Sequence, residues 1–131
     1  MRRSVHEVLF ASFLRDADAP EWKEEFPFCE WRRYRWDFAW PLLAVAVEIQ
    51  GGEWSSGEHA RGGGMAKDAM KLDLAVLLGW RVIVLTGSMV QRHGRELARG
   101  VAALVAGDTD AARLLFTEVG SRMLVEQRRK T

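Results

Sequence analysis

The segment RRYRWDFAWPLLAVAVEIQ, at residues 32–50, constrains the fold of this chain more than any other part of it. As far as Trp40 it alternates, with an aromatic residue at every second position from Tyr34 and with Arg35, Asp37 and Ala39 between them. This predicts a half-buried strand whose aromatic side chains share one face. After Pro41 the run LLAVAVEIQ is almost continuously apolar, which is typical of a central strand covered on both faces. Two successive strands predict a β-sheet at the centre of the fold.

The rest of the chain predicts helices around this sheet. Apolar residues with helical periodicity predict helices over residues 4–15, 66–79, 89–107 and 108–128. WRVIVLT, at residues 80–86, predicts a further buried strand. The acidic, turn-prone stretch before the aromatic strand predicts a loop that carries Trp22 and Phe26 against the core.

Several polar residues and one glycine mark the ends of these helices. Ser4 and Glu7 fit the S-x-x-E capping box at the start of the first helix. Gly79 is a stop signal for the helix before WRVIVLT, and Asp108 or Asp110 can cap the last helix.

The predicted order of elements is α–β–β–α–β–α–α. It indicates an α/β protein with a central mixed β-sheet flanked by helices and with two C-terminal helices. A chain of 131 residues can bury a hydrophobic core that is large enough to be stable without bound metals or disulfide bonds. We therefore expect a single domain, residues 1–131, with a core over about residues 4–106 and a C-terminal helix over about 108–128.

Composition excludes several classes of protein. With 48% hydrophobic and 28% charged residues the chain is ordinary for a globular protein. The one cysteine, Cys29, excludes an internal disulfide framework and favours a reducing compartment. No apolar run approaches the roughly 20 residues that cross a bilayer, and the N-terminus lacks a signal-peptide pattern. We expect a cytoplasmic protein of a bacterial or phage-infected cell that does not bind a membrane.

Two carboxylates interrupt the apolar strands. If the strands are neighbours, the two-residue period places Asp37, Glu48 and Gln50 on one face of the sheet. This face leads into GGEWSSGEHARGGGM, a loop with six glycines in fifteen residues. Two adjacent carboxylates repel each other, so they need a shared proton or a cation. Oxygen ligands without His or Cys favour Mg²⁺, for which Mn²⁺ can substitute.

These residues carry a family resemblance. Asp37 with Glu48-Ile49-Gln50 resembles the D-x(n)-(D/E)-x-K signature of the PD-(D/E)XK nuclease superfamily, with Gln50 in the place of the usual lysine. The predicted element order is similar to the restriction-endonuclease-like core of that superfamily. The longer run from YRWDFAW through HARGGGMAKDAMK to GWRVIVLT resembles small phage and prophage endonucleases and archaeal-type Holliday junction resolvases. The resemblance covers roughly residues 7–86.

The resemblance implies Mg²⁺-dependent hydrolysis of DNA. Asp37 and Glu48 would hold the metal, with the backbone carbonyl of Ile49 as a third ligand. Gln50 could orient the attacking water, but it cannot supply the positive charge of a lysine. Lys71 on the following helix is the first candidate to restore that charge, since some members of the superfamily carry their lysine there. Arg35 is the second candidate.

Further residues are assigned by the same resemblance. Related resolvases place an additional metal-site acid on the first helix, and Glu7 fits that position, although it could equally serve only in the capping box. In the glycine loop Trp54 could stack on a base, and His59 and Arg61 could contact DNA; the alternative is an exposed loop without function. Arg35 and Lys67 are further candidate DNA contacts, and the alternative for Lys67 is a solvated helix face.

The resemblance favours a homodimeric Holliday junction resolvase, because two sites related by a two-fold axis can make paired cuts in a four-way junction. Apolar residues of the last two helices could form the dimer face or simply cover the sheet. The alternative enzyme is a monomeric nicking or repair endonuclease for mismatched, branched or single-stranded DNA. Because Gln50 replaces the lysine, a catalytically inert DNA-binding relative is the third possibility. Separately from these functions, Asp37 and Glu48 could be strand-end carboxylates satisfied by arginines such as Arg35.

Overall fold

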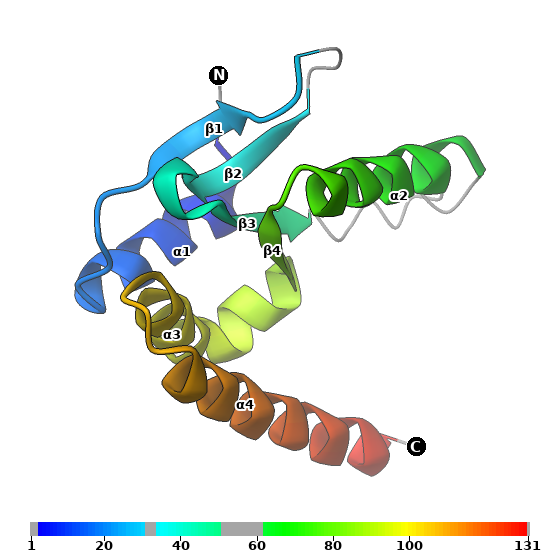
Figure 1. The fold of residues 1–131 in the computed structure, drawn as a ribbon. Helices are drawn as coiled ribbons and strands as arrows, with labels where there is room; N and C mark the ends of the chain where they lie inside the picture. Colours follow the sequence, from blue (N-terminus) through cyan, green and yellow to red (C-terminus); the bar gives the residue numbers. More distant parts are fainter. Residues whose placement is uncertain (1–2, 31–33, 51–61, 131) are drawn as a thin grey trace. The chain divides into compact units, whose positions relative to one another are not determined.

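Figure 1 shows a computed structural model of the chain, which describes residues 3–30, 34–50 and 62–130. In chain order the elements are α1 (Val5–Asp16), β1 (Lys23–Pro27), β2 (Arg35–Trp40), the 3-10 helix η1 (Pro41–Leu43), β3 (Val45–Gln50), α2 (Gly62–Leu77), β4 (Arg81–Thr86), α3 (Gly87–Val105) and α4 (Thr109–Lys130). The predicted α/β class is confirmed. Among the described residues, no helix is both long enough and apolar enough to cross a membrane.

The elements form two compact units. The sheet unit comprises Glu21–Ser88, and the helical unit comprises Met1–Pro20 with Met89–Thr131. The sheet unit holds all four strands and α2, while the helical unit holds α1, most of α3 and α4. Whether the whole chain behaves as one domain stays a prediction.

The sheet is mixed, as predicted, with the strand order β1-β2-β3-β4. β1 and β2 are antiparallel, as are β2 and β3, whereas β3 and β4 are parallel over Val45↔Arg81 to Gln50↔Thr86. Parallel neighbours need a crossover connection, and α2 supplies it. The carboxyl ends of β3 and β4 therefore lie at the same edge of the sheet, with α2 over the face that carries Ala46.

The acidic stretch that was predicted to be a loop contains the edge strand β1. It pairs with β2 from Lys23↔Ala39 to Pro27↔Arg35. The prediction was wrong because charged residues and proline have low strand propensity. An edge strand tolerates both, since one of its sides needs no partner.

The second predicted strand begins later than expected. Leu42 and Leu43, at its predicted start, belong instead to η1. Ala44 follows with a left-handed φ of 53°, and β3 begins at Val45. Pro41 favours this local helix because its fixed φ suits the first position of a helical turn. Leu42 is consequently exposed to solvent.

The alternation of β2 breaks at Asp37, which sequence analysis did not predict. Trp36 packs with Ala39, Ala46 and Ala75 beneath α2. Phe38 and Trp40 instead contact Trp22. The four aromatic residues expected on one face are thus divided between the two faces of the sheet.

A paired irregularity in β1 and β2 explains this break. The register of β2 with β3 begins at Phe38↔Val47, one residue after Asp37. In β1 the residue opposite Asp37 is Glu25, whose φ is 52°, although pairing is regular on either side of it. Such irregularities re-aim side chains and often lie next to functional sites.

The helical unit has the caps that the sequence predicted. The Glu7 amide donates to Ser4 Oγ at 3.1 Å, and the Ala111 amide donates to Asp108 Oδ1 at 3.0 Å. Its core includes the buried side chains of Phe10, Leu14, Leu97, Val101 and Val119.

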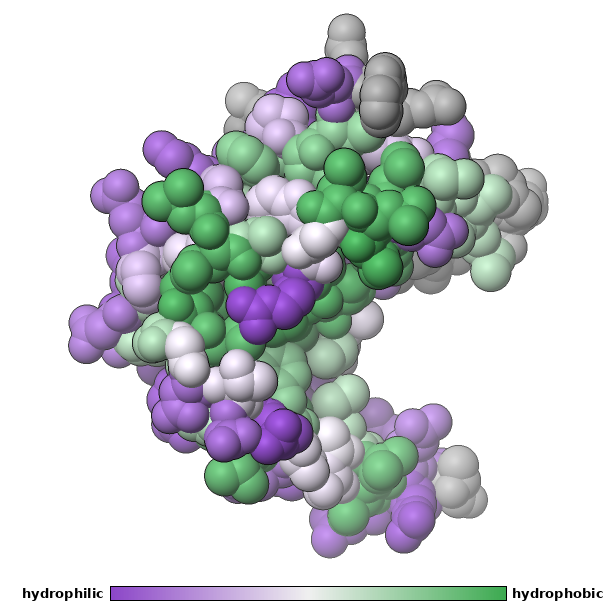
Figure 2. Space-filling view, viewed as in Figure 1, coloured by the Kyte–Doolittle hydropathy of each residue, from purple (hydrophilic) through white to green (hydrophobic). Residues whose placement is uncertain are grey.

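Exposed apolar side chains lie on both units. On α4, Leu114 and Leu124 are exposed. Those of α2 include Met70, Val76 and Leu77, and Figure 2 shows apolar side chains gathered over the C-terminal half of this helix. The predicted homodimer and its interface stay predictions.

Two helix glycines predict opposite effects on stability. A Cβ on Gly100 would lie 2.6 Å from the Phe116 ring, whereas a Cβ on Gly120 would meet nothing within 4 Å. We expect Gly100→Ala to lower the free energy of unfolding by about 1–3 kcal/mol through overpacking. Gly120→Ala should raise it by about 0.5–1 kcal/mol, because alanine is the better helix former. Urea unfolding followed by circular dichroism measures both, and equal effects would contradict this packing.

Candidate active site

The sheet unit brings Glu48 and Lys71 together. Glu48 lies two residues before the end of β3, and Lys71 lies in α2, the crossover helix that follows. The Lys71 ammonium donates a 2.7 Å hydrogen bond to Glu48 Oε2, and the two side chains are only 15% and 22% exposed. An ion pair so shielded from water holds both groups in one arrangement. The helix therefore carries Lys71 to the carboxylate with which sequence analysis grouped it, although its catalytic role stays a prediction.

The environment of Glu48 favours its protonated form. Burial raises the pKa of Glu48 from 4.5 to about 7, and the negative charge of Asp37 raises it as well. The positive charge of Lys71 and its hydrogen bond act in the opposite direction. Near neutral pH the carboxyl group is poised between its two forms, so a bound cation would favour the ionised one.

An indole ring lies against Lys71. The Lys71 Nζ atom is 4.8 Å from the ring centroid of Trp36, which is within the range of a cation–π contact. Trp36 is fully buried, and it stacks on Phe28 with ring centroids 4.1 Å apart. The ring and Glu48 together restrict the ammonium group. Sequence analysis missed this role because regular alternation placed Trp36 on the other face.

A small pocket opens beside the ion pair. Its lining comprises Trp36, Glu48, Gln50, Asp68, Lys71, Leu72 and Val84. A volume of about 20 Å³ gives room for one water molecule or one metal ion. Within the described ranges, Glu48 Oε1 and Trp36 Nε1 are buried without a hydrogen-bond partner. A buried acceptor without a partner costs free energy, so Glu48 Oε1 would be stabilised by a water or a cation in the pocket.

Asp37 lies next to this pocket. Its Oδ2 atom accepts a 2.7 Å hydrogen bond from the Ile49 amide. This bond ties the irregular part of β2 to β3 and fixes the Asp37 side chain beside the strand that carries Glu48. The family resemblance implies that the Ile49 carbonyl binds the metal, which stays a prediction; in the structure the Ile49 amide positions Asp37.

Glu25 is an acidic neighbour that sequence analysis missed. One of its carboxylate oxygens lies within 4.8 Å of one of Asp37. The signal for it was absent, because the stretch around Glu25 did not resemble a strand and gave no register. The left-handed φ of Glu25 accompanies this approach of the two acids.

Sequence analysis also predicted further site residues, on other parts of the chain. Arg35 on β2 and Lys67 on α2 are exposed, which is compatible with DNA contacts but does not distinguish them from a solvated surface. Trp54, His59 and Arg61 lie outside the described residues. Glu7 belongs to the helical unit, where its amide completes the cap of α1.

The donor set fits a hard divalent cation. Asp37, Glu48 and Gln50 offer oxygen atoms, and one of these, Glu48 Oε1, is buried and unpartnered among the described residues. Mg²⁺ prefers carboxylate oxygens and retains waters that a substrate phosphate can replace. The sequence prediction of Mg²⁺ or Mn²⁺ is therefore chemically reasonable for these residues, and it stays a prediction.

Comparisons with known proteins found no match to this chain. No family model matches it, and no curated protein and no solved structure has significant similarity to it. Its function must be argued from the site.

Proposed function

We propose that the protein is a metal-dependent endonuclease that hydrolyses DNA phosphodiester bonds. The observation that carries the proposal is the placement of Lys71 at 2.7 Å from Glu48, in a pocket that also contains Gln50 and lies beside Asp37. Two acids, one amide and one ammonium group at the carboxyl end of β3 are the groups that phosphodiester hydrolysis needs. The resemblance of Asp37 and Glu48-Ile49-Gln50 to the PD-(D/E)XK signature supports the same chemistry.

Each side chain has a definable role in this chemistry. Asp37 and Glu48 would hold a Mg²⁺ ion, whose chemistry when bound would be to polarise the scissile phosphate and to lower the pKa of a water. The Gln50 side-chain oxygen can accept a hydrogen bond from the attacking water and so orient it. Lys71 can donate its remaining N–H bonds to the phosphoryl oxygens as negative charge develops on them. Trp36 keeps the ammonium group in place without neutralising it.

The position of Lys71 supports this proposal over that of an inert relative. With Gln50 at the signature position, no cation of the described residues would line the pocket if α2 did not supply Lys71. Lys71 supplies one at the same pocket, so the substitution by Gln50 does not by itself remove the catalytic charge.

We further propose that the substrate is branched DNA, and a four-way junction in particular, cut in pairs by a homodimer. This step rests on the resemblance to archaeal-type resolvases. A monomeric nicking or repair endonuclease is the alternative within the same chemistry.

The test is cleavage of a synthetic four-way junction and of a matching linear duplex, with Mg²⁺ or with EDTA. We expect paired, symmetric cuts in the junction alone, and no cutting with EDTA. Metal-dependent cutting of both substrates would retain the nuclease and reject the resolvase. Failure to cut either substrate, with DNA binding that ignores Mg²⁺, would reject the nuclease.

A further inference from the structure

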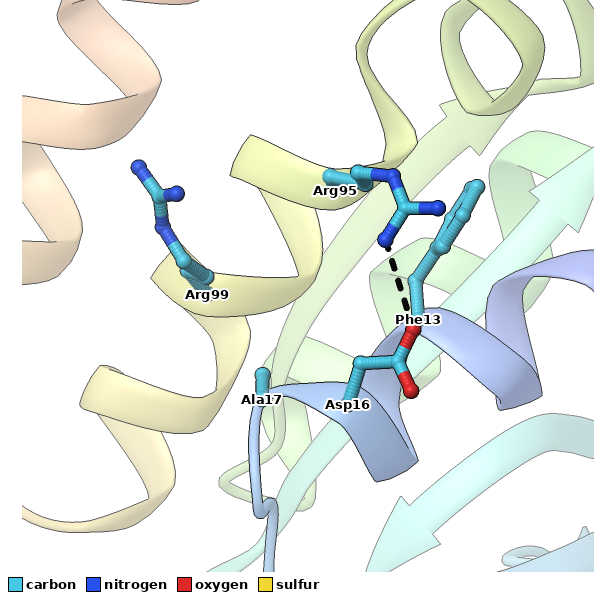
Figure 3. Close-up of a pocket in the computed structure, with 5 residues that line it drawn as sticks. All are labelled: Phe13, Asp16, Ala17, Arg95 and Arg99. Carbon is cyan, nitrogen blue, oxygen red and sulfur yellow. Dashed lines mark hydrogen bonds and ion pairs between the residues drawn. The ribbon is translucent and has the colours of Figure 1, made fainter.

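The helical unit contains a groove that the proposed chemistry does not use. It runs between the C-terminal end of α1 and one side of α3, and consists of two adjoining hollows of about 150 Å³ and 440 Å³. The first is lined by Phe13, Asp16, Ala17, Arg95 and Arg99, which Figure 3 shows. The second shares three of these residues and continues along alanines of α3. Together the hollows have the volume of a small-molecule site.

Arg95 is fixed on one wall of the groove. Its guanidinium carbon lies 4.9 Å from the ring centroid of Phe13, and its Nη1 atom is 3.3 Å from Asp16 Oδ2 (Figure 3). The glycine at 94 lets the ring approach, since a Cβ there would lie 2.5 Å from it. The Arg95 side chain is nevertheless 70% exposed. A planar cation is thus held by a ring and a carboxylate while most of it remains accessible.

Arg99 lies one helical turn further along α3 and contacts neither an aromatic ring nor a carboxylate of the described residues. It is exposed, and in the part of the chain that the structure describes it makes no hydrogen bond or ion pair. In Figure 3 its guanidinium group points away from Asp16. Beyond it the groove is lined by Ala102, Ala103 and Ala106, which offer an apolar surface without side-chain donors or acceptors.

The charges of the groove restrict its ligand. Arg95 and Arg99 are opposed by Asp16 and Asp18, so the groove has no net charge. A simple anion would gain from the arginines and lose from the aspartates. A ligand that suits both has an anionic group for the arginines and N–H donors for the aspartates, and a phosphate joined to a flat base combines the two.

We propose that this groove binds a single unpaired nucleotide. The base stacks on the guanidinium plane of Arg95, as bases stack on arginine in single-stranded recognition. Asp16 accepts a hydrogen bond from an amino or ring N–H group of the base, the sugar lies on the alanines, and Arg99 binds the phosphate. The site lies within the helical unit, and its existence does not depend on cleavage by the sheet unit.

The test uses the whole protein in EDTA, titrated with deoxynucleoside monophosphates, the corresponding deoxynucleosides and inorganic phosphate. Calorimetry gives the affinities. Arg99→Ala should weaken monophosphate binding about tenfold and leave nucleoside binding unchanged. Arg95→Lys keeps the charge but removes the plane, and should weaken both ligands about tenfold. Arg113→Ala on α4, another exposed arginine with an acidic neighbour, is the control and should change neither.

Three results would overturn the proposal. Inorganic phosphate that binds as tightly as the monophosphates would indicate an anion site without base recognition. Unchanged binding in both Arg95→Lys and Arg99→Ala would place the nucleotide elsewhere. The absence of measurable binding by the wild-type protein would leave the groove without this ligand. The substituted side chains are exposed, so circular dichroism should confirm that the variants fold.

Discussion

Asp37→Asn and Glu48→Gln are each expected to lower the rate of phosphodiester cleavage by about 10³-fold or more, while the protein remains folded. Each change removes one negative charge and keeps the size of the side chain. An amide binds Mg²⁺ far less strongly than a carboxylate does, so the loss should be larger at low metal concentration. Cleavage of the four-way junction over a series of Mg²⁺ concentrations measures both the rate and the metal dependence.

Glu48→Gln should also change the pH dependence of the free energy of unfolding, which a merely misfolded site would not do. Because the folded-state pKa of Glu48 is about 7 and its ordinary value is 4.5, the protonated carboxyl stabilises the fold below pH 4.5. That contribution falls as the pH rises through 7 and is worth up to about 3 kcal/mol. The free energy of unfolding of the wild type should therefore decline between pH 5 and 8 relative to that of Glu48→Gln. Parallel pH profiles would contradict the burial of Glu48.

Asp37→Asn has a matched control in Glu24→Gln. Glu24 is also an acid in the β1–β2 ladder, but its carboxylate accepts a hydrogen bond from Trp22 at an exposed position. We expect full cleavage activity from Glu24→Gln. Equal losses in both variants would mean that the ladder, and not the metal site, is sensitive to these acids.

The parts of the fold that sequence predicts well are those in which periodicity and burial agree. The α1 and α4 caps, the stop at Gly79 and the strand at 81–86 follow from local side-chain chemistry, and the structure has them near the expected residues. β1 was missed because its charged residues suit an edge strand, and being at an edge is a property of the whole sheet.

The candidate site was predicted only in part for a similar reason. Glu48 and Gln50 share a face because they lie two residues apart in one strand. The directions of the Asp37 and Trp36 side chains depend on an irregularity of β2 that involves Glu25 on the neighbouring strand. The residue pattern of β2 alone cannot reveal it. Lys71 depends on how α2 packs on the sheet, so the sequence could propose its contact with Glu48 but could not establish it.

Lys71→Met should lower the cleavage rate by about 10²- to 10³-fold, because it removes the only cation of the described residues that lines the pocket. Methionine keeps most of the length of the side chain and its contact with Trp36. Lys23→Met, which changes an exposed lysine on β1 in the same unit, is the control and should keep most of the activity. Single-turnover cleavage at saturating DNA separates this loss of rate from weaker binding.

The cleavage rates of the wild type and of Lys71→Met should be compared at high pH as well as at neutral pH. Lys71 lowers the pKa of Glu48, so Lys71→Met should raise it and reduce the ionised fraction at neutral pH. At pH 9 Glu48 should be largely ionised in the wild type, and saturating Mg²⁺ favours the same form in the variant. A deficit that persists there belongs to the ammonium charge. A deficit that disappears would make Lys71 a residue that positions and tunes Glu48, not one that acts on the phosphate.

A second substitution tests whether the charge or the particular residue matters. Gln50 and Lys71 line the same pocket, so a lysine at position 50 could place its ammonium group in the space that Lys71→Met vacates. We expect the double variant Lys71→Met/Gln50→Lys to recover at least about tenfold in rate over Lys71→Met alone, since one preorganised cation is worth more than that. Lys71→Met/Gln50→Met changes the same position without adding charge and should recover nothing. Both double variants could also be equally slow although both are folded. That result would show that a lysine at position 50 on β3 cannot replace Lys71 on α2 in this protein.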